Sequence, residues 1–132
     1  MNICVLDSYA IITFFEKEKG FEKVIDIFTE SAGGKLKILI NIINWGEVYY
    51  IVLREQGSKA AALFEESFKK LPVELVYCDY SLTKKASEFK AFNSLSYADC
   101  FAAATASIYK ATLVTGDREF LKLKKDIIIE WL

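Results

Sequence analysis

The chain has 132 residues, of which 53% are apolar, and its formal net charge is −1. This length suits one domain with a substantial hydrophobic core, and the apolar share argues against a disordered chain. The sequence has no histidine, which excludes Ser-His-Asp and Cys-His catalysis within the chain, and the near-zero charge excludes binding of nucleic acid by bulk positive charge.

The first predicted element is a short buried strand at residues 2–6, NICVL. No basic region precedes its apolar residues and Asp7 interrupts them, so we interpret it as a strand and not as a signal peptide. No apolar run in the sequence reaches the roughly 18 residues of a membrane span. A helix is expected from Tyr9 to about Lys17, and a second helix over about 21–31, ended by Gly33-Gly34.

The alternation of strand and helix continues to the end of the chain. A strand at 36–40 precedes Asn41, which can cap a long helix to about Glu55, and a further helix runs from Gly57-Ser58 to about Lys70. The later elements are a strand at 73–77, a helix over about 80–92, a helix from Ser96 to about Lys110, and strands at 112–114 and 127–129.

Short, uniformly apolar strands separated by helices are typical of a parallel sheet that is covered on both faces. The sequence therefore predicts one α/β domain over residues 1–132, with a mostly parallel five-stranded sheet flanked by helices on both faces. In such sheets ligands bind beyond the carboxyl ends of the strands. The residues that directly follow the strands are thus the first candidates for a functional site.

The three cysteines, Cys4, Cys78 and Cys100, form no CxxC pair, and we interpret them as reduced, mostly buried thiols of a cytoplasmic protein. Without histidine, three scattered cysteines disfavour a zinc site. Any metal should therefore be a hard cation such as Mg²⁺ or Mn²⁺, held by carboxylate oxygens.

Two aspartates directly follow predicted strands. Asp7 ends the first strand, and Asp117 follows the fourth strand and Thr115-Gly116. Each can be a helix N-cap, since aspartate is among the preferred capping residues. Each can equally be a ligand at the carboxyl edge of the sheet.

Two further acids lie in predicted helices. Asp99 stands three residues after Ser96, the spacing of a capping box, and leads a run of alanines that lets a helix approach the sheet closely. Glu47 lies in a helix that is apolar almost all round, so it is expected on a partly buried face. A buried carboxylate needs hydrogen bonds or a cation, although a salt bridge to Arg54 or a lysine, or simple exposure, remains an alternative.

Independent helix caps account for Asp7, Asp99 and Asp117 but not for Glu47. A shared divalent cation accounts for all four acids, because converging carboxylates repel one another unless a cation neutralises them.

The chain resembles the PIN domain family, and in particular the VapC-type toxins of type II toxin–antitoxin systems. The resemblance covers essentially the whole chain. It depends on VLDS at 5–8, NWGEV at 44–48, and SYADCFAAATA at 96–106 leading to LVTGD at 113–117. One departure is Gly46, where the family often has a small hydroxyl residue before the glutamate.

The resemblance implies a Mg²⁺- or Mn²⁺-dependent endoribonuclease in which one ion lowers the pKa of a bound water and a second steadies the leaving oxygen. The matching catalytic and metal-binding positions are Asp7, Glu47, Asp99 and Asp117. Ser8 and Thr115 match positions that contact the substrate phosphate or orient carboxylates. The resemblance also implies a homodimer and an antitoxin protein that covers the active site.

Other interpretations stay open at this point. The chain could be another Mg²⁺-dependent phosphoester hydrolase or a non-catalytic protein-binding module of the PIN fold. The apolar helix after Asn41 could lie in the core or form an interface. Lysine groups such as the one formed by Lys122, Lys124 and Lys125 could guide RNA phosphates or simply be solvated.

Overall fold

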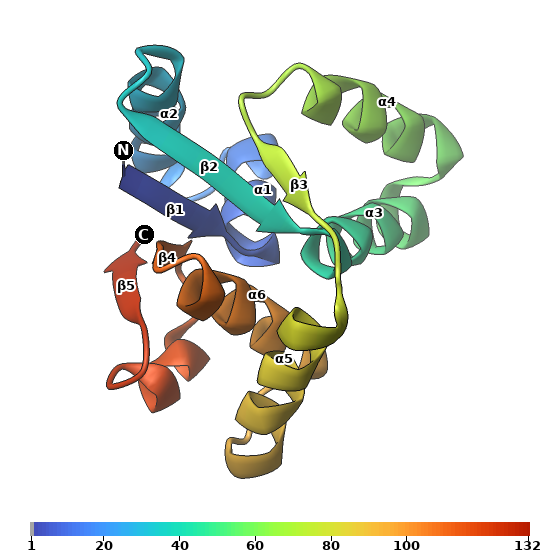
Figure 1. Ribbon diagram of the computed structural model, residues 1–132. Coiled ribbons are helices and arrows are strands. Elements are labelled where there is room, and N and C mark those ends of the chain that lie inside the picture. The colour runs from blue at the N-terminus through green and yellow to red at the C-terminus, as the bar shows by residue number, and fades with distance from the viewer. Residues whose placement is uncertain (1) are drawn as a thin grey trace.

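Five parallel strands form one sheet in the computed structural model, which describes residues 2–132 (Figure 1). The strands are β1 (Asn2–Leu6), β2 (Leu36–Asn41), β3 (Glu74–Val76), β4 (Thr112–Thr115) and β5 (Ile128–Trp131). Their order across the sheet is β3-β2-β1-β4-β5. The predicted α/β class with a five-stranded sheet is confirmed, and every strand pair is parallel.

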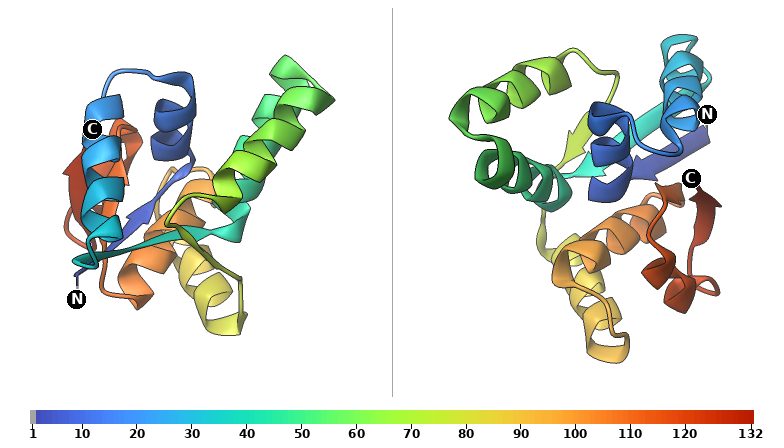
Figure 2. Two further views of the ribbon diagram at one scale, coloured as in Figure 1. Left: turned by 90° about the horizontal axis from the view of Figure 1, so that it is seen from above. Right: turned by 180° about the vertical axis from the view of Figure 1, so that it is seen from behind.

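Helices fill the connections between the strands. They are α1 (Ser8–Glu16), α2 (Phe21–Ala32), α3 (Ile42–Gln56), α4 (Ser58–Lys69), α5 (Tyr80–Phe92) and α6 (Tyr97–Ile108), with a 3₁₀-helix η1 (Arg118–Leu123). Figure 2 shows α1 and α2 on one side of the sheet and α5 and α6 on the other, so helices flank both faces as expected. Within residues 2–132, none of these helices has the length and apolarity that crossing a membrane demands.

Each face of the sheet packs against its own set of helices, because successive residues of a strand point to opposite faces. Cys4, Leu6, Ile38, Ile40 and Val114 belong to a core shared with α1 to α4. Val5, Leu39, Val76 and Leu113 belong to a second core shared with α5, α6 and η1. The uniformly apolar strand sequences are thus explained by burial on both faces.

Side-chain caps begin several helices. The Oδ1 atom of Asn41 accepts a hydrogen bond from the Ile43 N–H at 2.8 Å, which confirms Asn41 as the cap of α3. The Oγ atom of Ser96 accepts from the Asp99 N–H at 3.1 Å at the start of α6. Both caps satisfy backbone donors that a helix N-terminus leaves free.

Helix α3 is only partly buried. Asn44, Val48 and Val52 face the core, whereas Tyr50 and Leu53 are exposed. The helix is therefore not wholly enclosed in the core of the chain, and its exposed aromatic and aliphatic side chains leave the interface interpretation open.

The order of the strands places a topological switch point between β1 and β4. From β1 the chain moves to β2 and β3 on one side, and then returns to β4 and β5 on the other side. Where connections leave two adjacent parallel strands in opposite directions, the loops at their carboxyl ends separate and leave room for a ligand. Asp7 follows β1 and Asp117 follows β4, so both lie at this switch point.

Candidate active site

Asp7 is both a helix cap and a buried carboxylate. Its Oδ1 atom accepts a hydrogen bond from the Ala10 N–H at 2.9 Å, and its Oδ2 atom accepts one from the Thr115 hydroxyl. The residue is 1% exposed. Burial, together with the nearby charges of Asp99 and Asp117, raises the pKa of Asp7 from 3.8 to about 7, against the opposing effect of these two hydrogen bonds. Capping alone does not explain why a carboxylate is kept at so unfavourable a position.

Thr115 connects the two aspartates at the strand ends. Its buried hydroxyl donates to Asp7 and accepts from the Asp117 N–H at 3.0 Å. Because both capacities of this hydroxyl are used within the protein, the arrangement favours a role in orienting Asp7 over contact with a substrate phosphate. The Oδ1 atom of Asp117 in turn accepts from the Glu119 N–H at 3.0 Å and caps η1.

Asp99 lies in the first turn of α6. Burial raises the pKa of Asp99 to about 6, and the charges of Asp117, Glu47 and Glu119 contribute in the same direction, while the Ser96 hydrogen bond lowers it. The charges of Asp117 and Glu47 thus act on the pKa of Asp99, and those of Asp99 and Asp117 act on the pKa of Asp7. Acids from β1, α3, α6 and the end of β4 therefore share one region.

Asn44 holds α3 and α6 together beside Glu47. Its Nδ2 atom donates to the carbonyl oxygen of Ala98 at 3.0 Å, one residue before Asp99. One turn along α3, the Oε1 atom of Glu47 is buried, and no hydrogen-bond partner is found for it among residues 2–132. The alternative of a salt bridge to Arg54 is not realised, because the Arg54 guanidinium contacts Glu55 at 3.6 Å.

A buried carboxylate oxygen without a partner is costly and calls for a specific compensation. The Oδ1 atom of Asn44 is likewise buried without a hydrogen-bond partner within the described chain. Two unpartnered oxygen atoms on α3, near Asp99 of α6, form the kind of donor set that hard cations prefer.

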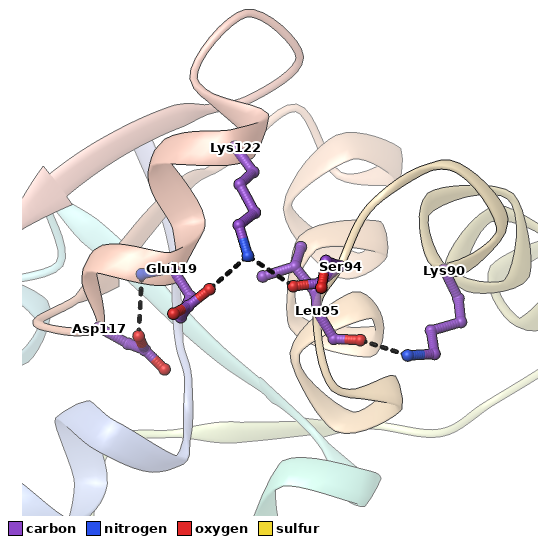
Figure 3. A network of polar contacts seen from close by, with 6 residues as sticks. All are labelled: Lys90, Ser94, Leu95, Asp117, Glu119 and Lys122. Carbon is purple, nitrogen blue, oxygen red and sulfur yellow. Dashed lines mark hydrogen bonds and ion pairs between the residues drawn. The ribbon is translucent and has the colours of Figure 1, made fainter.

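Two lysines fix the loop between α5 and α6 (Figure 3). Lys122 of η1 donates to the Glu119 carboxylate and to the Ser94 carbonyl oxygen at 2.7 Å, and Lys90 of α5 donates to the Leu95 carbonyl oxygen at 2.6 Å. The segment that leads into α6 and Asp99 is thereby tied to the segment that follows Asp117. Lys122 therefore makes contacts within the protein, to the Glu119 carboxylate and the Ser94 carbonyl oxygen.

The acids are close enough to influence one another, but they do not form a finished coordination shell. Among residues 2–132, no three His, Cys, Asp or Glu side chains are near enough to enclose a metal ion as they stand. The oxygen-only donor set and the unpartnered Glu47 oxygen nevertheless fit a hard divalent cation. Metal binding by these acids stays a prediction.

The four acids were predicted from the sequence, whereas several contacts around them were not. Ser8 lies partly buried in the first turn of α1, as the first residue of that helix. The bridging role of Asn44 and the contact of Tyr9 with Gly116 were not anticipated. An asparagine three residues before a glutamate on an apolar helix is a signal that could have pointed to Asn44.

The model of the PIN domain matches residues 4–126 of the chain. One similar solved structure is VapBC2 from Rickettsia felis bound to a DNA fragment from its promoter. It is 17% identical with a TM-score of 0.78, and the match covers 98% of each chain. DNA-bound VapBC from Salmonella typhimurium is 20% identical with a TM-score of 0.76, again covering 98% of each chain.

VapC20 from Mycobacterium tuberculosis, described as a sarcin-ricin loop cleaving toxin, is 14% identical with a TM-score of 0.71. The match covers 90% of this chain and 93% of that chain. At such identities these likenesses show a common fold. A comparison with curated protein sequences gives no match.

Proposed function

The chain belongs to the PIN domain family, and from this premise we propose that it is a Mg²⁺- or Mn²⁺-dependent endoribonuclease, the toxin of a toxin–antitoxin pair. The observation that carries the proposal is that Asp7 and Asp99, at and beside the switch point of the sheet, lie close enough to other acids, Asp117 and Glu47 among them, for those charges to add to the effect of burial on their pKa values. Asp7 and Asp99 have raised pKa values there, and Glu47 has a buried oxygen without a partner. Perturbed acids in one region of a fold are typical of catalytic sites.

The proposed metal ligands are Asp7, Glu47, Asp99 and Asp117. When bound there, the cation would lower the pKa of a water and offset negative charge on the phosphodiester. Thr115 and the Ala10 N–H fix both oxygens of Asp7, so this carboxylate is oriented before any ligand arrives. Asp99 is placed by the Ser96 cap, and Asp117 by its own cap on η1.

We also propose a protein partner, because the chain is similar to structures of toxin–antitoxin complexes. Similar structures are those of VapBC complexes, and one is described as a member of the VapBC family of toxin-antitoxin systems from Mycobacterium tuberculosis. An antitoxin that covers the acidic site, a homodimer, and a cytoplasmic location are all parts of this proposal. The exposed Tyr50 and Leu53 of α3 supply apolar surface that such an interface could use.

The test is Mn²⁺-dependent cleavage of RNA by wild type, Asp99→Asn and Asp26→Asn. Asp26 is an exposed acid of α2, so its variant makes the same change in net charge outside the site. We expect Asp99→Asn to reduce cleavage about a thousandfold, because a bound metal ion contributes several kcal/mol of transition-state stabilisation and each 1.36 kcal/mol is tenfold in rate. Asp26→Asn should cleave as the wild type does. Full cleavage by well-folded Asp99→Asn, checked by circular dichroism, would refute the proposal.

A further inference from the structure

The ring of Tyr9 lies directly against Gly116. A Cβ atom placed on Gly116 would lie 2.2 Å from Cε1, 2.6 Å from Cζ and 2.9 Å from Cδ1 of Tyr9, so the ring edge occupies the space that any side chain at this position would need. Tyr9 stands two residues after Asp7, and Gly116 stands one residue before Asp117. The ring therefore bridges the two strand ends that carry these acids.

This contact explains the glycine in the stretch Thr115-Gly116-Asp117. Gly116 does not have a positive φ, in contrast to Gly20, Gly34 and Gly57. Its backbone conformation is open to other residues, so conformational freedom is not the reason for glycine here. The reason is the close approach of the Tyr9 ring, which leaves no room for a side chain.

Packing against Gly116 does not bury Tyr9, which is 44% exposed. A large aromatic side chain at the rim of the acidic site thus stays accessible to a ligand. The cationic side chain nearest in sequence to Asp117 is Arg118, and its guanidinium lies over the ring of Trp131, 4.5 Å from the centroid. Arg118 is thus engaged by Trp131, and Lys122 by Glu119 and Ser94, so the Tyr9 ring offers RNA an attraction at this rim that does not depend on charge.

We propose that Tyr9 is a stacking contact for a nucleobase of the RNA next to the cleaved phosphodiester. A neutral ring attracts the π-face of any base without opposing the negative charge of the site, and such stacking favours an unpaired base. The inference rests on the proposed ribonuclease function and narrows its substrates to RNA with an unpaired nucleotide at the cut.

The test uses a single-stranded RNA that the wild-type protein cuts, together with copies in which the nucleotide on either side of the cut is abasic. Wild type should cut the intact RNA about tenfold or more faster, in kcat/KM, than one of the two abasic copies, since base stacking on an aromatic ring commonly has an effect of this size. In Tyr9→Leu, cleavage of the intact RNA should fall to the rate of that abasic copy. Tyr9→Phe should keep the preference.

Two further variants separate stacking from a general effect on the site. Tyr109→Leu removes a tyrosine of similar exposure outside the site. Tyr109 lines a cavity with Asn2 and Thr112, at the amino ends of β1 and β4, so this variant should cut as wild type does. Gly116→Ala should displace the Tyr9 ring and lose the base preference, with little further loss when combined with Tyr9→Leu. If Tyr9→Leu slows intact and abasic RNA by the same factor, the ring is a structural element and the inference is wrong.

A binding measurement gives a readout that does not depend on turnover. With 2-aminopurine at the preferred position, Asp99→Asn protein should quench its fluorescence, and Asp99→Asn/Tyr9→Leu should not. Equal quenching by both would overturn the stacking role while leaving the proposed function intact. A wild-type protein that cuts no RNA in Mg²⁺ or Mn²⁺ would instead refute the proposed function, and this inference with it.

Discussion

Thr115 is the residue on which both strand-end aspartates depend. Replacing it by valine keeps the shape but leaves Asp7 Oδ2 and the Asp117 N–H without their partner. Loss of a partner for a buried polar group costs about 1–3 kcal/mol, so urea unfolding of Thr115→Val should show a stability loss of that order. Thr115→Ser keeps the hydroxyl and should lose much less. Equal stability of the valine and serine variants would contradict the bridging role.

The raised pKa values of Asp7 and Asp99 predict a pH dependence of the metal-free protein. Both acids bind protons more tightly in the folded than in the unfolded chain, so their contribution to stability is present at low pH and is lost as the pH rises through about 6 to 7. For Asp7 the difference between 3.8 and about 7 corresponds to roughly 4 kcal/mol as an upper bound.

Thermal unfolding in a chelator should therefore give a Tm that falls between pH 5 and pH 8 (by several degrees, on the order of 4 °C or more per kcal/mol). Asp7→Asn should remove most of that fall, because asparagine does not titrate. Its amide oxygen can still accept the hydrogen bond from the Ala10 N–H, so the helix cap is kept. Added Mn²⁺ should raise the Tm at pH 8 more than at pH 5, because metal binding needs ionised carboxylates. A pH profile unchanged in Asp7→Asn would show that burial of Asp7 is not its cause.

At the residue scale, the sequence was informative about residue types and uninformative about contacts between distant positions. The four acids could be predicted because each has a local signal, such as a position after an apolar run. The hydrogen bond from Thr115 to Asp7 joins residues 108 positions apart, and the ring of Tyr9 meets Gly116 across a similar separation. Such contacts depend on which strands become neighbours, which no local pattern encodes.

At the element scale, helices and central strands were predicted to within a residue or two, because caps such as Asn41 and Ser96 are local signals. The edge strands deviate by a similar amount. The expected strand at 73–77 is reduced to Glu74–Val76, and the strand expected at 127–129 is found at Ile128–Trp131. An edge strand has one neighbour, and its ends are set by the register of that single pairing.

The alanines of α6 determine how closely this helix, and Asp99 with it, approaches the sheet. Ala102, Ala103 and Ala104 are completely buried, between the sheet and α5. Ala103→Leu adds volume to a closely packed core and should cost about 1–3 kcal/mol in chemical unfolding. Because α6 would shift away from the sheet, Mn²⁺ affinity should fall as well.

The control is Ala91→Leu, an exposed position in α5. Leucine and alanine have similar helix propensities, so this variant should stay within about 0.5 kcal/mol of wild type. If Ala103→Leu were as stable as Ala91→Leu, the small-residue face of α6 would not be needed for close packing.

At the scale of the whole molecule, the sequence predicted the class of fold but not the order of the strands. Alternating strands and helices indicate a parallel sheet, yet several orders satisfy the same pattern. The observed order brings β4 beside β1. This pairing places the strand ends that precede Asp7 and Asp117 next to each other. The meeting of these two strand ends is therefore a property of topology, whereas the alternation of strands and helices predicted only that both aspartates lie at the carboxyl edge of the sheet.

The net charge of −1 gives the molecule no general attraction for RNA, and the acids at the switch point repel phosphates locally. A bound divalent cation would reverse that local field. Asp117→Asn should therefore have opposite effects in the two states of the site. In a chelator it removes a repelling charge and should bind RNA more tightly than wild type does, whereas in Mn²⁺ it weakens the cation site and should bind RNA less tightly.

Fluorescence anisotropy with a labelled RNA measures both conditions on the same protein, and Asp26→Asn separates the local field from total charge. Asp26→Asn changes the net charge equally but lies outside the site, so it should shift affinity slightly, and in the same direction with and without Mn²⁺. A reversal of sign found for Asp117→Asn alone places the cation at the switch point. Parallel shifts for both variants would mean that total charge governs RNA binding and that the four acids do not act through a shared ion.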